Sequence, residues 1–138
     1  MQSFRKNILK LLPAFAIILL AGLLLSRVWS PGMPATPSVS ITAHEANGHI
    51  GKTAEVCGLV ASASFLRQVR GSPTFLNFEK PYPDQVFTVV IWGDNRSAWD
   101  QPPEILYDQK RICVIGRISS HDGRPQIIVR NPGNIRME

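Results

Sequence analysis

Hydrophobic and polar residues alternate with a period of two along much of the chain after residue 52. Side chains of a β-strand point alternately to the two faces of a sheet, so this period is typical of strands with one buried face. The pattern predicts five strands, at residues 52–60, 74–78, 85–92, 111–119 and 125–130. The positions expected to point inward are Leu76, Phe78, Phe87, Val89, Ile91, Ile127 and Val129, whereas Val90 is expected to face outward.

Short helices and turns separate these strands. Thr42 and Glu45 have the spacing of a capping box, in which a hydroxyl and a carboxylate each satisfy a backbone N–H at a helix start. They predict a short helix at residues 43–49, and Pro102–Tyr107 has the composition of a second one. Residues 65–73 and 94–101 read as polar connections, residues 81–84 as a turn, and residues 121–124 as a hairpin turn with Asp-Gly at its tip.

The order of the predicted elements indicates the fold class. Three strands, a helical segment and two further strands follow one another as they do in an OB-fold. We therefore expect residues 40–138 to form an all-β domain, a five-stranded OB-fold Greek-key barrel with short helices. The composition, with 44% hydrophobic and 18% charged residues, excludes an intrinsically disordered chain. A chain of 138 residues is also too short for two domains with separate cores.

The first 29 residues have the pattern of a targeting segment. Leu11–Leu25 carries no charge, and neighbouring apolar residues extend the stretch to residues 8–28, which is long enough for one membrane-spanning helix. Arg5, Lys6 and Lys10 precede it and Arg27 alone follows it, so the N-terminus is expected in the cytoplasm. The prediction is a signal anchor in the inner (cytoplasmic) membrane, with the OB domain periplasmic or extracellular. The alternative is a cleaved signal peptide and a secreted protein.

The charge distribution changes once this segment is set aside. Residues 1–30 hold four of the 15 Lys and Arg residues and none of the 10 Asp and Glu residues, so the net charge of +5 falls to +1. Residues 30–39 form a Pro-rich linker that favours extended conformations. The remaining charge is polarised, with −3 over residues 31–109 and +4 over residues 110–138. A polyanionic ligand would therefore have to use this local basic surface.

Five runs of sequence carry a resemblance to a known family: residues 51–60, 73–78, 87–91, 114–118 and 123–128. They resemble the bacterial OB-fold domains of the nucleic-acid-binding type, which are related to the tRNA anticodon-binding barrel. The resemblance covers residues 40–136. It implies the fold, and it implies a binding surface that OB-folds use for single-stranded nucleic acid, oligosaccharides or proteins.

Strand alternation and the adjoining loops select the residues expected on that surface. They are Arg67, Arg70, Phe75, Asn77, Thr88, Trp92, Arg117, Arg124, Gln126 and Arg130, with His121 at the turn beside them. Exposed aromatic rings beside arginines suit single-stranded DNA or RNA, because bases stack on the rings and guanidinium groups hold phosphates. The alternative is an interaction or structural module that docks to another envelope protein and has no nucleic-acid ligand.

Cys57 and Cys113 fall on outward positions of the first and fourth predicted strands, which are neighbours in an OB barrel. Export favours oxidation, so we expect a disulfide bond between them rather than two unpaired thiols. In the chain-entropy model, closing a loop of about 55 residues contributes about 4 kcal/mol to stability.

Chemistry typical of an enzyme is missing from the sequence. His44 and His49 do not share a helical face, His121 lies in a distant turn, and no zinc pattern or phosphate-binding glycine loop occurs. The haem chaperone of cytochrome c maturation also combines a membrane anchor with an exported OB barrel. The late histidine of this chain, His121, lacks the following His-x-x-x-Tyr arrangement that this family uses. We therefore predict a binding module without catalysis, cofactor or metal.

Overall fold

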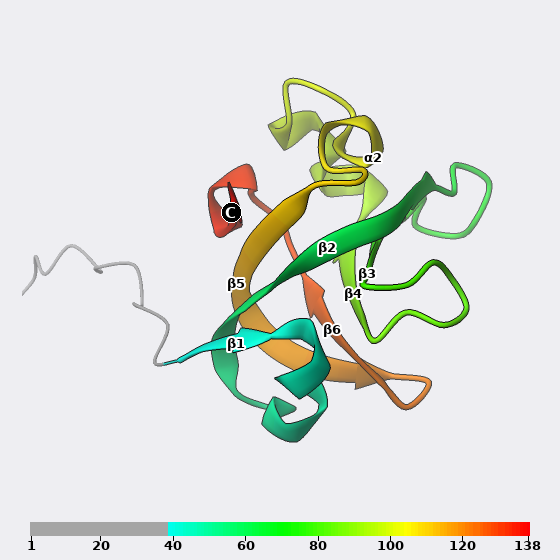
Figure 1. Ribbon diagram of the computed structural model, residues 1–138. Coiled ribbons are helices and arrows are strands. Elements are labelled where there is room, and N and C mark those ends of the chain that lie inside the picture. The colour runs from blue at the N-terminus through cyan, green and yellow to red at the C-terminus, as the bar shows by residue number, and fades with distance from the viewer. Residues whose placement is uncertain (1–38) are drawn as a thin grey trace, which may run out of the picture. The chain divides into compact units, whose positions relative to one another are not determined.

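The computed structural model describes residues 39–138 (Figure 1). The predicted signal anchor, residues 1–29, and all but the last residue of the predicted linker lie outside the described residues. Within residues 39–138, no helix has the length and hydropathy required to cross a bilayer.

The described chain is mostly β-structure with a few short helices. Its strands are β1 (Ser40–Thr42), β2 (Thr53–Phe65), β3 (Thr74–Phe78), β4 (Phe87–Ile91), β5 (Arg111–His121), β6 (Arg124–Ile128) and β7 (Ile135–Met137). Its helices are the 3-10 helices η1 (Ala43–His49), η2 (Gly93–Ala98) and η3 (Pro132–Asn134) and the α-helix α2 (Pro103–Leu106). The five predicted strands correspond to β2–β6, and the helices predicted at residues 43–49 and 102–107 are confirmed as η1 and α2.

The structure adds elements that the sequence pattern did not predict. β1 and β7 are three residues long, too short to show alternation, and β2 extends five residues beyond its predicted end at residue 60. Residues 94–101, predicted as a polar connection, contain part of the 3-10 helix η2 at residues 93–98, which the sequence pattern did not predict. The predicted capping box is present: the Thr42 backbone N–H donates to Oε2 of Glu45 over 2.7 Å, and the Thr42 hydroxyl donates to the same oxygen over 2.8 Å.

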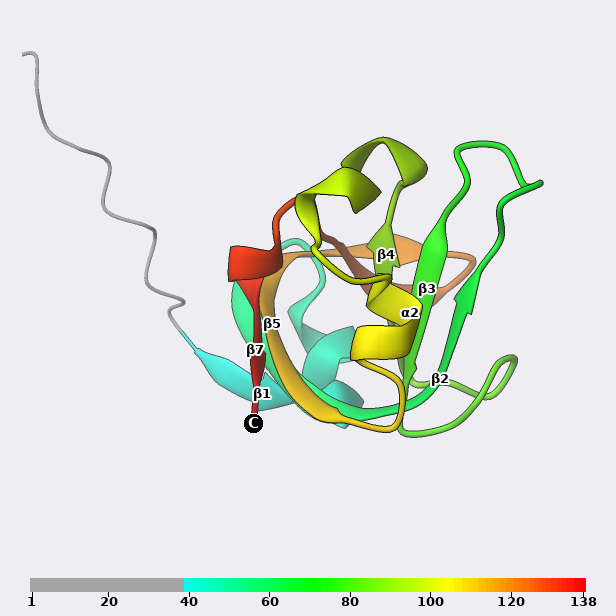
Figure 2. The same cartoon turned by 90° about the horizontal axis from the view of Figure 1, so that it is seen from above.

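All seven strands belong to one sheet, in the order β1-β2-β3-β4-β6-β5-β7, and a further pairing between β2 and β5 closes five of them into a ring (Figures 1 and 2). The β4–β6 and β1–β2 pairs are parallel and the others antiparallel. β2 and β5 pair with each other from Thr53↔Arg117 to Leu59↔Arg111. The edge of β2 that faces away from β5 pairs first with β1 and then with β3. The edge of β5 that faces away from β2 pairs first with β7 and then with β6.

Two glycines allow the long strands to pass close to their neighbours as the ring closes. A Cβ atom on Gly116 of β5 would lie 2.6 Å from Cγ2 of Ile127, and one on Gly58 of β2 would lie 3.0 Å from Cδ2 of Phe78 on β3 and closer still to the Glu79 carboxylate. Any larger residue at either position would require its neighbour to move. The register of β2 against β3 shifts between Val60 and Ser62, which is the irregularity expected where a strand bends.

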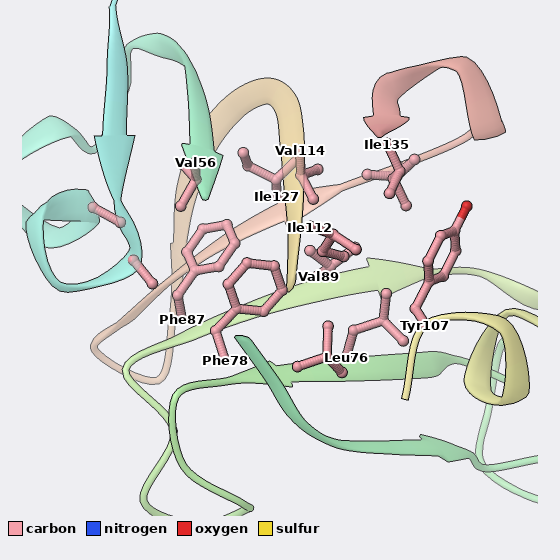
Figure 3. Packing of buried hydrophobic residues seen from close by; sticks show 14 of the residues in the cluster. Val56, Leu76, Phe78, Phe87, Val89, Tyr107, Ile112, Val114, Ile127 and Ile135 are labelled. Atoms are coloured by element: carbon pink, nitrogen blue, oxygen red, sulfur yellow. The ribbon is translucent and has the colours of Figure 1, made fainter. Parts of the chain in front are cut away.

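The hydrophobic core fills the inside of the ring (Figure 3). Phe78 and Phe87 meet edge to face with their centroids 5.1 Å apart. All seven residues predicted to point inward are buried. In Figure 1 the segment with η2 and α2 lies at the top of the ring and η1 lies at the bottom. The upper segment contributes Trp99 and Tyr107 to the core, whose Nε1–H and hydroxyl oxygen form a buried hydrogen bond of 3.0 Å.

Val90 departs from the prediction that it is an exposed outward residue. It alternates as expected with the inward residues of β4, yet only 2% of its surface is exposed. Its cross-strand partners are Phe75 and Ile128, two large apolar side chains on the same outward face. Cross-strand neighbours of this size bury a central residue even on the outside of a sheet.

Candidate ligand-binding groove

A groove of about 660 Å³ runs across the outer faces of β3, β4 and β6. The β3–β4 loop forms one wall, and the turn between β5 and β6 forms another. The lining residues are Ser64, Leu66, Phe75, Asn77, Tyr82, Pro83, Gln85, Thr88, His121, Asp122, Arg124, Pro125 and Gln126. The groove therefore lies on the face that strand alternation predicted.

Strand register arranges the outer face of β2, β3, β4 and β6, which contains the floor of the groove, in two cross-strand rows. The polar row contains Ser62, Asn77, Thr88 and Gln126, one from each of β2, β3, β4 and β6. The next row contains Ser64, Phe75, Val90 and Ile128. Because neighbouring residues in each row are directly opposite each other, a polar strip and a largely apolar strip lie side by side.

A chain of hydrogen bonds connects the rim of the groove to this polar row. Nη1 of Arg124 donates to Oε1 of Gln85 over 2.9 Å, and Nε2 of Gln85 donates to the Thr88 hydroxyl over 3.4 Å. The Thr88 hydroxyl donates to Oδ1 of Asn77 over 3.4 Å, and Nδ2 of Asn77 donates to the Ser62 hydroxyl over 3.1 Å. Every bond runs in the same direction, so each acceptor is polarised by the donor before it.

This network separates residues that organise the groove from residues that can contact a ligand. Asn77 is only 4% exposed, and both ends of its amide are engaged, so it orders the floor. Gln126 is partly exposed and makes no side-chain hydrogen bond to any other residue in the range 39–138. Its amide is free to donate to and accept from a bound molecule.

Aromatic and apolar side chains stand beside the polar strip. Phe75 is partly exposed on the floor, Tyr82 on the β3–β4 loop is 75% exposed, and Leu66 is 38% exposed. Tyr82, Gln85 and Leu66 were not among the predicted site residues. The sequence signal for Tyr82 was its place between two prolines in a turn, where an aromatic ring has no core to enter.

The groove brings together five of the ten predicted ligand-binding residues: Phe75, Asn77, Thr88, Arg124 and Gln126. The other five do not line it. Arg67 borders a separate hollow with Phe65 and Arg96, Arg70 lies on the exposed loop after β2, and Arg130 follows β6. Trp92 packs against the backbone of that loop, where a Cβ on Gly71 would lie 2.9 Å from the indole ring. Arg117 lies opposite Thr53, in the part of β5 that pairs with β2.

Ion pairing reduces the basic surface expected at the C-terminal end. Arg111 pairs with Glu138 over 2.9 Å, and Arg136 pairs with Glu55 over 2.9 Å. Arg124 also donates to the carbonyl oxygens of Pro83 and Gln85, which fixes the β3–β4 loop against β6. Among residues 39–138, Arg124 is the only Lys or Arg that lines the groove, and the lining also includes the acidic Asp122.

The predicted disulfide between Cys57 and Cys113 is confirmed, with the two Cα atoms 4.0 Å apart on directly opposed residues of β2 and β5. Glu55 lies two residues before Cys57 on the same face. Its carboxylate accepts two hydrogen bonds from Arg136, at 3.0 and 2.9 Å, and one from the Ser40 hydroxyl at 3.1 Å. The Arg136 guanidinium holds the pKa of Glu55 below its usual value.

Comparison with known proteins adds little to this geometry. No protein-family model and no curated protein matches the chain. One solved structure, described as an aspartyl-tRNA synthetase from Leishmania major Friedlin, superposes with a TM-score of 0.45 and 10% identity. The superposition covers 79% of this chain and 22% of that one. A TM-score below 0.5 does not establish a shared fold.

Proposed function

We propose that residues 40–138 form an OB-fold barrel that acts as a binding module without catalysis, and that single-stranded nucleic acid binds in the groove. The observation that supports this proposal is the convergence of Phe75, Tyr82 and Gln126 on one open surface. Each base that stacks on an aromatic ring contributes about 1–3 kcal/mol. A free amide beside the rings can pair with the edge of a base.

The electrostatic contribution in this proposal is small. Arg124 is the single cationic side chain of Lys or Arg type in the groove, and Asp122 lies beside it. For single strands, the slope of log K against log salt is about −0.7 for each neutralised phosphate. We therefore expect a slope of about −1 or shallower, which distinguishes binding by stacking from non-specific attraction to a polyanion.

The proposal also includes the cellular location. The domain would lie outside the inner membrane, held by a single span at residues 8–28 with the N-terminus in the cytoplasm, or secreted if that segment is cleaved. The charge asymmetry of residues 1–30 supports this orientation. Protease accessibility of the domain in intact cells and after opening the outer compartment would test it.

The direct test is fluorescence anisotropy with a labelled oligothymidine and the full chain in mild detergent. We expect the single strand to bind more tightly than a duplex of the same length. Tyr82→Ala should weaken binding about 5- to 150-fold, the equivalent of one lost stacking contact. Tyr82→Phe, which keeps the ring, should retain most of the affinity.

The matched control is Ile105→Ala on α2, which changes a side chain that is 69% exposed and lies outside the groove. It should leave the affinity unchanged. Absence of binding at low salt would contradict the proposal. Equal losses in the Tyr82→Ala and Ile105→Ala proteins would show that the groove is not the binding surface.

A second candidate is docking to another envelope protein. It is favoured by the apolar side chains around the loop after β2, where Leu66, Val69 and Trp92 are 38–50% exposed. In this case, cross-linking in cells should give one specific product that is lost in Val69→Glu and retained in Tyr82→Ala. The reverse result would favour the groove.

A further inference from the structure

Three potential metal ligands gather on the outer face of β2 and β5, outside the groove. They are the carboxylate of Glu55 and the sulfur atoms of Cys57 and Cys113, and one ligand atom from each lies within 4.8 Å of the others. Cys57 and Cys113 are directly opposed across the strand pair. Oε1 of Glu55 lies 3.9 Å from Sγ of Cys57.

The backbone beneath this cluster is held on every side. β2 lies between β1 and β5 at Glu55 and Cys57, and β5 lies between β2 and β7 at Cys113. Glu55 is 9% exposed and Cys113 is 1% exposed, whereas Cys57 is partly open to solvent. These strand pairings hold the backbone of all three residues independently of the S–S bond.

The spacing suits a tetrahedral zinc ion. Zinc binds thiolate sulfur at about 2.3 Å and carboxylate oxygen at about 2.0–2.2 Å. Ligand atoms around such an ion are separated by about 3.5–3.8 Å, as follows from those bond lengths and the tetrahedral angle. Oε1 of Glu55 and Sγ of Cys57, 3.9 Å apart, already lie near that separation. The two sulfur atoms are 2.01 Å apart in the disulfide, so they would have to move apart once the S–S bond is broken.

We propose that reduction of the Cys57–Cys113 disulfide converts this cluster into a Zn²⁺ site formed by two thiolates and the Glu55 carboxylate, with water as fourth ligand. A dithiol reductant supplies two electrons and two protons, the S–S bond breaks to give two thiols, and the reductant becomes a disulfide. Zn²⁺ then replaces the two thiol protons, which pass to solvent. The disulfide and the metal exclude each other, because each uses both sulfur atoms.

Arg136 provides an internal check on this assignment. Its guanidinium donates to both oxygens of Glu55, so it competes with the metal for the same carboxylate. Its positive charge also repels a cation. Arg136→Gln should therefore tighten metal binding, whereas Glu55→Gln should weaken it. A purely structural role of the ion pair would give no opposite effects of this kind.

The test uses the full chain, reduced with dithiothreitol and freed of reductant without oxygen, with Co²⁺ as a spectroscopic probe. We expect one Co²⁺ per chain, a thiolate-to-cobalt charge-transfer band, its loss on addition of Zn²⁺, and release of two protons per zinc. Glu55→Gln should lower the affinity at least about tenfold. Glu138→Gln, which changes an exposed carboxylate at the end of the neighbouring strand β7, should have no effect.

The oxidised wild-type protein serves as the folded control without thiols, so the test does not depend on the folding of a cysteine variant. It keeps all three histidines of the chain, and adventitious binding by them would appear equally in both redox states. Absence of the charge-transfer band in the reduced protein would overturn the proposal. Unchanged affinity in Glu55→Gln would also overturn it, because the carboxylate would then not be a ligand.

Discussion

Replacing both cysteines with alanine tests how much the Cys57–Cys113 disulfide contributes to stability. The bond joins residues separated by 56 positions. In the chain-entropy model, removing a link over a loop of this length stabilises the unfolded chain by about 4 kcal/mol. The free energy of the folded state should change little, because antiparallel backbone pairing from Thr53↔Arg117 to Leu59↔Arg111 already holds the two strands in register.

A loss of about 4 kcal/mol is large beside the total of about 5–15 kcal/mol typical of a domain. We expect the Cys57→Ala/Cys113→Ala protein to fold but to unfold at a much lower urea concentration. The assay is equilibrium urea unfolding of the full chain, followed by far-ultraviolet circular dichroism in the presence of a metal chelator.

Two results would refute this reasoning. Wild-type protein unfolded under reducing conditions should match the double variant, because both lack the same link. If the reduced and substituted proteins differ by more than about 1 kcal/mol, the substitution has acted through packing at Cys113. If both lie within about 1 kcal/mol of the oxidised wild type, the unfolded chain is not restricted as the chain-entropy model requires.

Three further predictions concern the fold and the wall of the groove. Gly116→Ala should lower the free energy of unfolding, measured in urea, by about 1–3 kcal/mol, because its Cβ would overlap the branched side chain of Ile127. Adding Ile127→Leu should recover part of that loss. If the effects of the two substitutions simply add, this explanation is contradicted. Glu45 has its pKa lowered from 4.5 chiefly by the hydrogen bond from the Thr42 backbone, so the stability that it contributes is present above about pH 4.5 and lost as the pH falls through the lower folded pKa. Thermal melts of Glu45→Gln should therefore lack that part of the acid dependence, and parallel curves for the two proteins would argue against the capping box. Arg124→Ala should speed amide hydrogen exchange in residues 81–86 with little change in overall stability, and unchanged exchange there would show that the loop is held by other contacts.

Local patterns in the sequence predicted the central elements of the fold because the forces that form them are local. The alternation over residues 74–78 matches β3 without any difference in bounds. The Asp-Gly pair forms the expected hairpin turn, with positive φ values of 50° at Asp122 and 76° at Gly123. β1 and β7 escaped prediction because a three-residue strand forms only when a distant strand offers it an edge.

Five of the ten predicted site residues line the candidate groove, for a related reason. Alternation placed Phe75, Thr88 and Gln126 on one face, and the ring of strands then brought them together. Tyr82 and Gln85 were missed because they lie in a loop, where no period indicates a direction. Conversely, Arg117 and Trp92 satisfy the pattern but lie outside the groove. Arg117 lies in the part of β5 that pairs with β2, and Trp92 follows the end of β4 and packs against the loop after β2.

Local sequence patterns were enough to predict which side chains share a face, where the strands turn, and which two cysteines lie on outward positions. Which of those side chains have partners depends on how distant strands pair. Glu55 and Arg136 are 81 residues apart, and their ion pair depends on β2, β5 and β7 lying side by side. The Cys57–Cys113 bond depends on the pairing of β2 with β5. Alternation follows from backbone geometry, which every residue carries with it. Pairing depends on the order in which distant strands close the ring, and no short stretch of sequence contains that order.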